Sequence, residues 1–446
     1  MRIRNHRRRK TSRVKRPVLV IATLVALLGI LPFVLPFQLY IPRLEQALSH
    51  QLQEPVAVSE LKLALFPAPH IRLEGVAIGL LRDINIQYIT IYPDLFSLMN
   101  SVMTLNTIEL DGIKVDDDTI GKAAALIGDT KGTAGVRVRE IKLRHVDFKP
   151  GRADFGLLQA DIELNPAGGL DHGSVYSPDG RLNAVVRPDG KNFAATLTAR
   201  NWRIPLDPHV VFDTLNMDAL ISDDGMKISD LNGTLYGGSV KGKAVLDWSD
   251  GWKVDGDLKA GDIELESLLP LFTASASVSG RLSIDGNYRM SARDPGKLGD
   301  GLDGSFRFNI KNGVIYNMDL ARAVRSVTHE VRGGQTSFEQ FTGKLRINGK
   351  QLRFQDTRIA SGLLKAEGNL NIGATRKIAG HARVEIKGTA SVLSMPMEIS
   401  GNLSDPVLLP EKTAMAGAVA GTAILGPGIG TSAGAKAGEF VNKLLK

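Results

Sequence analysis

Polar and apolar residues alternate along most of this chain, and that alternation is its dominant pattern. Four long runs show it most clearly: INIQYITI (84–91), VRVREIKLRHVDF (136–148), MKISDLNGTLYGGSVKGKAVLD (226–247) and LRFQDTRI (352–359). A period of two residues is typical of β-strands with one apolar and one polar face. Turn-forming residues interrupt the pattern at 178–180, 188–190, 255–256 and 311–313. The sequence therefore predicts a mainly β chain in which antiparallel hairpins follow one another.

Helical periodicity is confined to short segments. We expect helices at 42–54, around 93–99, at 118–128 and at 318–331. In the last of these, Leu320, Val324, Val327 and Val331 form one apolar stripe, and Asn317 is a candidate N-cap. The stretch 294–304 is rich in glycine and aspartate and is the most linker-like part of the chain.

The segment 227–256 is echoed by the segment 353–380. The echo is carried by residue pairs with a constant offset of 126, Asp230 with Asp356 and Gly242 with Gly368. After a slip of two residues, Lys253, Val254 and Gly256 correspond to Lys377, Ile378 and Gly380. The echo predicts a repeated run of strands, and therefore an elongated body.

The first fifty residues predict a membrane anchor. No charged residue occurs over the 26 positions from Pro17 to Pro42, whereas a bilayer core of about 30 Å requires roughly 20 apolar residues as a helix. The alternative is a cleaved signal peptide, but the bulky residues GILPFVLPFQLY (29–40) offer no small-residue cleavage site. We therefore expect an uncleaved transmembrane helix at 17–39.

The distribution of charge predicts the orientation of that anchor. Nine of the 55 Lys and Arg residues lie in the first sixteen positions, and without them the formal net charge of +8 becomes about −1. A basic tail at 1–16 is expected to stay in the cytoplasm, which places the body in the periplasm and the tail against anionic lipid headgroups. An RNA-binding arm is the less favoured interpretation, and the nearly neutral body indicates no nucleic-acid partner.

The C-terminal tail, 411–446, is rich in glycine and alanine. Residues 413–435 carry no charge, and glycines recur at intervals of four on either side of Pro427, a spacing that favours close helix packing. Three interpretations stay open: a helical hairpin packed on the body, a segment in contact with a membrane, or a disordered tail.

The residues needed for catalysis or metal binding do not come together in the sequence. The chain has no cysteine, which excludes disulfides, thiolate metal sites and cysteine nucleophiles. The pattern 430–434 (GTSAG) resembles a nucleophile elbow, yet the last histidine, His381, precedes it. The eight histidines are dispersed, the acidic run 116–118 lacks calcium-loop spacing, and 426–430 lacks a phosphate-binding lysine. We predict no catalytic residue, no metal and no cofactor, and a protein that is not an enzyme.

Several segments resemble the AsmA family, in the order in which that family has them. The N-terminal resemblance is carried by 44–79, DLFSLMN (94–100) and LNTIELDGIKV (105–115). The C-terminal resemblance is carried by 228–247, 254–269, 304–324 and MPMEISGNLSDPVLLP (395–410). The resemblance implies two β regions, at 40–290 and 291–410, behind the anchor.

The resemblance also implies a fold and a function. The fold is an elongated, taco-like antiparallel β groove, and the family is related to bridge-like lipid-transfer proteins with roles in outer-membrane lipid and protein homeostasis. We therefore expect a lipid-handling protein of the Gram-negative inner membrane. Its partners would be phospholipid acyl chains, the inner membrane and a periplasmic or outer-membrane protein. No groove residue is predicted individually.

Two alternatives remain at this point. A closed β-sandwich would show the same alternation as an open groove. A tethered scaffold that offers strand edges to outer-membrane proteins would suit the same anchor, whereas a hydrolase is disfavoured by the missing nucleophile and metal sets. An open groove would in addition need covers for its strand edges.

Overall fold

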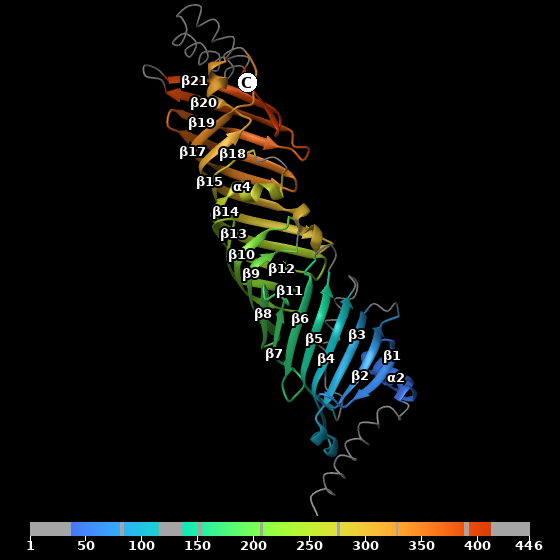
Figure 1. The fold of residues 1–446 in the computed structure, drawn as a ribbon. Coiled ribbons are helices and arrows are strands. Elements are labelled where there is room, and N and C mark those ends of the chain that lie inside the picture. Colours follow the sequence, from blue (N-terminus) through green and yellow to red (C-terminus); the bar gives the residue numbers. More distant parts are fainter. Residues whose placement is uncertain are drawn as a thin grey trace, which may run out of the picture. The chain divides into compact units, whose positions relative to one another are not determined.

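A computed structural model describes residues 37–80, 84–115, 136–149, 154–205, 208–273, 277–326, 329–387 and 392–411. These residues form 22 strands assigned to one sheet, with few and short helices, which confirms the mainly β prediction. Close contacts divide the chain into two compact units (Figure 1). Unit 1 comprises residues 1–148 and 157–173, and unit 2 comprises 149–156 and 174–446.

Unit 1 begins with helices that lead into a sheet. Its elements are η1 (Phe37–Tyr40), α2 (Ile41–Leu52), β1 (Val56–Ala64), β2 (His70–Ile78), β3 (Ile84–Pro93), η2 (Leu95–Met99), β4 (Met103–Val115), β5 (Val136–Phe148), β6 (Leu157–Leu164) and the first part of β7 (Leu170–Tyr176). Strands β1 to β4 form an antiparallel meander. Strands β4 and β5 are parallel, so the prediction of hairpins throughout is wrong here. The reason is the long connection from Val115 to Val136, because a parallel pair needs a crossover of about a dozen residues or more.

The core of unit 1 lies on one face of this sheet. Val58, Leu73, Val76 and Ile86 are among its buried side chains. The apolar stripe of α2 packs against the same cluster through Ile41, Leu44, Leu48 and Leu52, which confirms the helix predicted at 42–54.

The same helix covers the free edge of β1. The backbone N–H of Val56 donates to Ser49 Oγ at 2.8 Å, and that of Val58 donates to Glu45 Oε1 at 2.7 Å. Among the described residues, β1 pairs with β2 alone, so these two N–H groups lie on its outer side. An edge strand with unpaired N–H groups invites aggregation, and the side chains of α2 satisfy two of them.

Removing these two caps should expose the edge of β1. In a Glu45→Ala/Ser49→Ala variant, we expect backbone amide exchange in β1 to be roughly tenfold faster, because each lost hydrogen bond is worth about 1 kcal/mol or more. Alanine favours helix, so α2 itself should persist. Hydrogen exchange followed by mass spectrometry measures the effect, and Gln46→Ala, at an exposed position of α2, is the control. Equal protection in both variants would contradict the capping role.

Unit 2 contains the rest of β7 and fifteen further strands joined by short connections. Its elements are β8 (Leu182–Asp189), β9 (Asn192–Arg203), β10 (Val211–Ile221), β11 (Gly225–Leu235), β12 (Gly238–Asp247), β13 (Trp252–Glu264), α4 (Leu265–Leu268), η4 (Leu269–Leu271), β14 (Arg281–Ala292), η5 (Pro295–Gly301), β15 (Asp303–Tyr316), α5 (Leu320–Arg325), β16 (Val331–Arg332), β17 (Gln335–Asn348), β18 (Gln351–Ser361), β19 (Leu364–Ile372), β20 (Ile378–Lys387), β21 (Val392–Asn402) and β22 (Asp405–Pro410). From β8 to β22 each strand pairs antiparallel with the next, except β16 (Figure 1).

The internal echo is confirmed by the strand pairing. Strands β11 and β12 correspond to β18 and β19 at the same offset of 126. Both pairs also carry a register shift at the same place, after which Leu231 lies opposite Gly242 and Thr357 lies opposite Gly368. A β-bulge bends and twists its strand locally. The repeated sequence therefore encodes a repeated bend as well as repeated strands.

One excursion from the meander covers the C-terminal end of unit 2. Between β15 and β17 the chain leaves the sheet, forms α5, and adds β16 to the edge of β22 through Val331 opposite Leu408. Leu320, Ala323 and Val324 of α5 are at most 1% exposed and pack in one cluster with side chains of β19 to β22. The expected cover of a strand edge is therefore present at this end too.

Three local predictions are wrong. Residues 255–256 and 311–313 lie inside β13 and β15 instead of in turns. The helix predicted at 318–331 is only six residues long, and its N-cap is Asp319, which accepts from the Arg322 N–H at 2.8 Å, instead of Asn317. The turn at 178–180 is confirmed. The turn predicted at 188–190 begins only at Gly190, because Pro188 and Asp189 still pair in β8. The helix predicted around 93–99 is the 3-10 helix η2.

Some predictions fall on residues that the structure does not describe. These are the basic tail 1–16, nearly all of the anchor 17–39, the helix 118–128 with the acidic run before it, and the tail from 412 onwards. Within the described residues, none of the helices has the length and apolar character needed to cross a bilayer. The division into β regions at 290 and 291 stays a prediction.

Candidate functional site

One face of the unit 2 sheet is apolar. In β18, β19 and β20, alternate side chains such as Phe354, Leu370 and Ala382 pack on this face against the hydrophobic cluster of α5. The residues between them, such as Arg353 and Asn371, are exposed. We call the first set, with its equivalents along β11 to β20, the apolar face. It follows directly from the period-two pattern, because successive side chains of a strand point to opposite sides.

A hollow of about 170 Å³ opens on this apolar face. It lies between α5 and the strands β15, β17, β18, β19 and β20. Its lining is chiefly apolar and includes Ile310, Phe341, Phe354, Ile359, Leu370 and Ile378. Phe341, Phe354, Ile359 and Leu370 are half-buried, so they are available to a ligand. A concave apolar surface of this kind suits a hydrophobic ligand.

Four phenylalanine rings form a cluster beside the hollow. Phe308 meets Phe341 and Phe354 edge to face, with ring centroids 5.1 and 5.7 Å apart, and Phe338 meets Phe341 at 5.8 Å. Edge-to-face pairs are worth about 0.5–1.5 kcal/mol beyond their buried area. The cluster therefore holds the rings in fixed positions on the apolar face.

Glycine and aromatic residues lie opposite each other at four places on adjacent strands. The pairs are Gly256 with Tyr288, Gly286 with Phe306, Gly343 with Phe308 and Gly313 with Phe338. A Cβ atom at any of these glycines would come within 3.0 Å of the paired residue. Each aromatic residue therefore occupies the space above its glycine, and the apolar face is aromatic at these places.

Tyr288 is the aromatic residue of these four pairs that has a hydroxyl group. Burial raises the pKa of the Tyr288 phenol, and the Asp257 carboxylate raises it further. The phenol therefore remains protonated and uncharged well above neutral pH.

Short connections cover parts of the apolar face. Leu298 of η5 is buried against a cluster that includes Ile228 and Val254. Leu265 of α4 is buried against Phe308 and Ile310. Together with α5, these segments cover the apolar face at three places. The hollow lies beside α5.

The opposite face of unit 2 is charged. Arg289 Nε lies 2.6 Å from Asp255 Oδ1, and Lys344 Nζ lies 2.8 Å from Asp356 Oδ2, and all four side chains are more than half exposed. The hydrogen bond from Lys344 lowers the pKa of the Asp356 carboxyl. Such exposed pairs contribute little stability, but they show that this face meets water.

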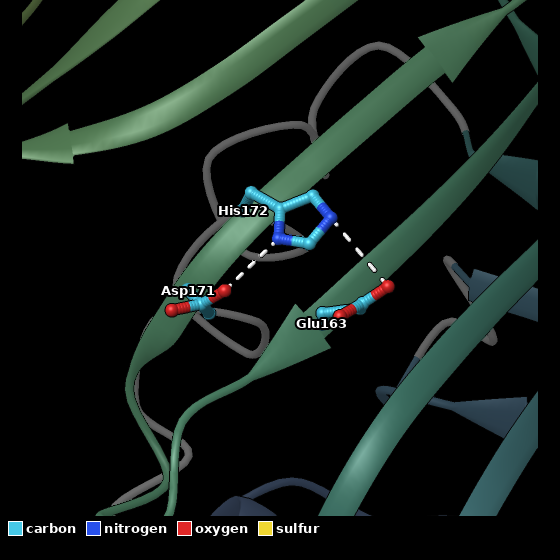
Figure 2. Close-up of side chains that lie close together, drawn as sticks. All are labelled: Glu163, Asp171 and His172. Carbon is cyan, nitrogen blue, oxygen red and sulfur yellow. Dashed lines mark hydrogen bonds and ion pairs between the residues drawn. The ribbon is translucent and has the colours of Figure 1, made fainter.

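One group of side chains in unit 1 has the composition of a metal site. Figure 2 shows His172 of β7 between two carboxylates, with Nδ1 3.0 Å from Asp171 Oδ2 and Nε2 3.5 Å from Glu163 Oε1. Both carboxylates are exposed, and each ring nitrogen already faces one of them. A surface ion-pair triad accounts for this arrangement, and we assign it no metal.

No groove residue was predicted from the sequence, so the hollow and the four glycine pairs are seen only in the structure. A signal for the pairs existed, because a glycine recurs at apolar-face positions of β12, β13, β14, β15, β17 and β19. The strand register was needed to match a glycine with its ring. His381, the last histidine, is exposed and lies 3.5 Å from Glu411. The motifs at 426–434 and 116–118 lie outside the described residues.

Comparison with known proteins gives one match. Residues 210–357, which run from the start of β10 into β18, match the family model described as AsmA family. No curated protein and no solved structure matches the chain. The matched region contains all four glycine pairs and the phenylalanine cluster.

Proposed function

We propose that this chain, a member of the AsmA family through residues 210–357, is a non-enzymatic lipid-handling protein that binds phospholipid acyl chains on the apolar face of unit 2. The observation that carries the proposal is the hollow between α5 and the phenylalanine cluster. Its lining is chiefly apolar, and burial of acyl methylene groups against such a lining is favourable by about 0.8 kcal/mol each.

The two faces of the unit 2 sheet support this function. Acyl chains need an apolar surface that is accessible from one side, while the other side of the same strands must remain in water. The half-buried rings of Phe341 and Phe354 and the exposed ion pairs of the opposite face meet both needs. The bound lipid would belong to a membrane that the protein serves.

The proposed location is the inner membrane of a Gram-negative cell, with the N-terminus in the cytoplasm and the body in the periplasm. The support is the charge-free run from Pro17 to Pro42 behind nine basic residues. In this position the protein would support lipid homeostasis and assembly of the outer membrane, together with a periplasmic or outer-membrane partner.

The alternative function, a scaffold that offers strand edges to client proteins, has less support. At the edge of β1, Ser49 and Glu45 already occupy two N–H groups. At the edge of β22, β16 occupies Val407 and Leu408. Covered edges are poor templates for strand addition.

Lipid binding can be tested with two neighbouring residues of β19. The full chain would be purified in mild detergent, and its phospholipid measured by extraction and native mass spectrometry. Leu370 lines the hollow, whereas Asn371 lies on the exposed face. We expect Leu370→Glu to retain at least about tenfold less phospholipid than the natural chain, because a carboxylate next to acyl chains is strongly unfavourable. Asn371→Glu should retain as much as the natural chain. A folded natural chain without phospholipid would contradict the proposal.

A further inference from the structure

Two loops at one end of the unit 1 strands carry exposed apolar side chains. One loop joins β1 to β2, and the other joins β3 to β4 and contains η2, the short coil beyond the strand ends in Figure 1. The antiparallel register places both loops at the same end of the sheet. Their exposed apolar residues, which we call the apolar tip, are Phe66 (78% exposed), Leu95 (50%), Phe96 (89%), Met99 (91%) and Val102 (41%).

The loop with η2 is braced from inside. The buried Ser97 hydroxyl donates to Asp94 O at 2.7 Å and accepts from the Thr104 N–H at 2.8 Å. The Asp94 carboxylate accepts from the Phe96 N–H at 3.1 Å. The polar groups of the loop are thus largely satisfied by one another, and transfer of its apolar side chains out of water would leave few of them without a partner.

The two loops are also joined at their bases. The rings of His70, which follows the first loop, and Tyr92, which precedes the second, have centroids 5.2 Å apart. The apolar tip is therefore one surface on a fixed base instead of two separate loops.

Basic residues lie at the same end of unit 1. Because β4 and β5 are parallel with Met103 opposite Val136, the beginning of β5 lies beside the loop with η2. Arg137 and Arg139 there are exposed, and Arg139 also lies 3.8 Å from Asp94. Apolar side chains at the tip could contact acyl chains, while the nearby guanidinium groups would lie at the level of the anionic headgroups.

The course of the chain indicates which surface covers the tip. Ser49 accepts a hydrogen bond from the Val56 N–H, and Glu45 accepts one from the Val58 N–H, so α2 runs antiparallel to β1. Four residues of a helix rise by about the same length as two residues of a strand. Residue Phe37 therefore lies towards the end of β1 that bears the tip. The charge-free run that begins at Pro17 ends at Pro42, and Phe37, the first described residue of this run, lies on that side.

We propose that the apolar tip inserts into the surface of the phospholipid bilayer that holds the N-terminal run. Unit 1 would then contact the bilayer at two places, the run and the tip, with Arg137 and Arg139 at the headgroups. This inference rests on the proposed membrane location and adds to it a fixed orientation of unit 1 on the membrane, and it does not depend on whether unit 2 binds lipid.

The absence of cysteine from the sequence allows a direct test. An environment-sensitive fluorophore would be attached to the full chain through Phe96→Cys or Met99→Cys, and the chain would be reconstituted in vesicles of phosphatidylethanolamine and phosphatidylglycerol. The control is Leu80→Cys, a similarly exposed residue (85%) at the other end of the unit 1 strands. We expect a blue shift and quenching by quencher-labelled acyl chains at 96 and 99, and neither at 80.

A second variant separates insertion from other contacts. Phe66→Asp combined with Val102→Asp should abolish most of the quenching at 96, whereas Val245→Asp, at an exposed position of unit 2, should not change it. Three other results would overturn the inference: equal quenching at 80, 96 and 99, a blue shift at 96 without acyl-chain quenching, which would indicate a protein partner, or a chain that stays outside the vesicle fraction.

Discussion

Replacement of Gly286 by alanine is expected to destabilise unit 2 by about 3 kcal/mol. A Cβ atom at this position would lie 2.1 Å from the Ser305 carbonyl oxygen and 2.7 Å from the Phe306 ring. The carbonyl belongs to the neighbouring strand, so relief requires the two strands to separate. Denaturant unfolding followed by tryptophan fluorescence measures the effect, because Trp202, Trp248 and Trp252 all lie in unit 2.

The matched control is Gly261→Ala in β13. Its Cβ atom would meet only Ser239 Oγ, at 3.7 Å, which is an ordinary contact. Alanine in a strand loses less conformational entropy on folding than glycine, so this variant should be unchanged or slightly more stable. If both variants unfold at the same denaturant concentration, the close approach of Gly286 to Phe306 does not determine stability.

Replacement of Val324 by aspartate is expected to release α5 from the sheet. Val324 is 0% exposed and packs in the cluster that contains Val384, Met395 and Met397. An unpaired carboxylate buried there would cost about 3–5 kcal/mol, which the six residues of α5 cannot offset. Hydrogen exchange in residues 318–326 measures the release, and we expect its protection to fall by two orders of magnitude or more.

Arg322→Asp is the control for this substitution. Arg322 is an exposed residue of α5, so an aspartate side chain there can stay in water. The same aspartate is therefore introduced two residues away from Val324, without burial. Equal loss of protection in the two variants would mean that the charge, and not its burial against the sheet, disrupts α5.

The period-two pattern was sufficient to predict a mainly β chain, because strands such as β13 and β19 alternate between more buried and more exposed positions. The open groove was expected only from the family resemblance. The internal echo was equally informative. The offset of Asp230 and Asp356 reflects strands with the same bulge, so a weak similarity carried real structural information. The α2 helix was predicted because both its apolar stripe and its flanking prolines are local signals.

The missed features depend on contacts between distant residues. Gly256 and Gly313 resemble turn residues in the sequence, and only the register shows that Tyr288 and Phe338 occupy the space above them. The apolar stripe of α5 was visible, but its partners on β19 to β22 follow it in the sequence by about 40 residues or more. The parallel pair β4 and β5 has no local signature at all, because each strand alone would also fit an antiparallel pair.

The apolar face could be predicted as a pattern but not as a site. Alternation marks Phe341, Phe354 and Leu370 as facing the same way only if every bulge is known, since one extra residue exchanges the two faces. The register shift between Phe354 and Thr357 is such a case. The apolar tip was also missed, because Phe96 and Met99 were assigned to a short helix whose exposure the sequence does not reveal.

The pairing of β16 with β22 has a consequence for the order of folding. Almost every other pairing in unit 2 joins strands that are neighbours in the sequence, so it can form as soon as each hairpin is complete, with a short loop to close. Val331 and Leu408, in contrast, can meet only after all strands from β17 to β22 have been made. The meander can therefore grow from its N-terminal side in chain order. The pairing of β16 with β22 forms last, because it requires the whole series of hairpins from β17 to β22.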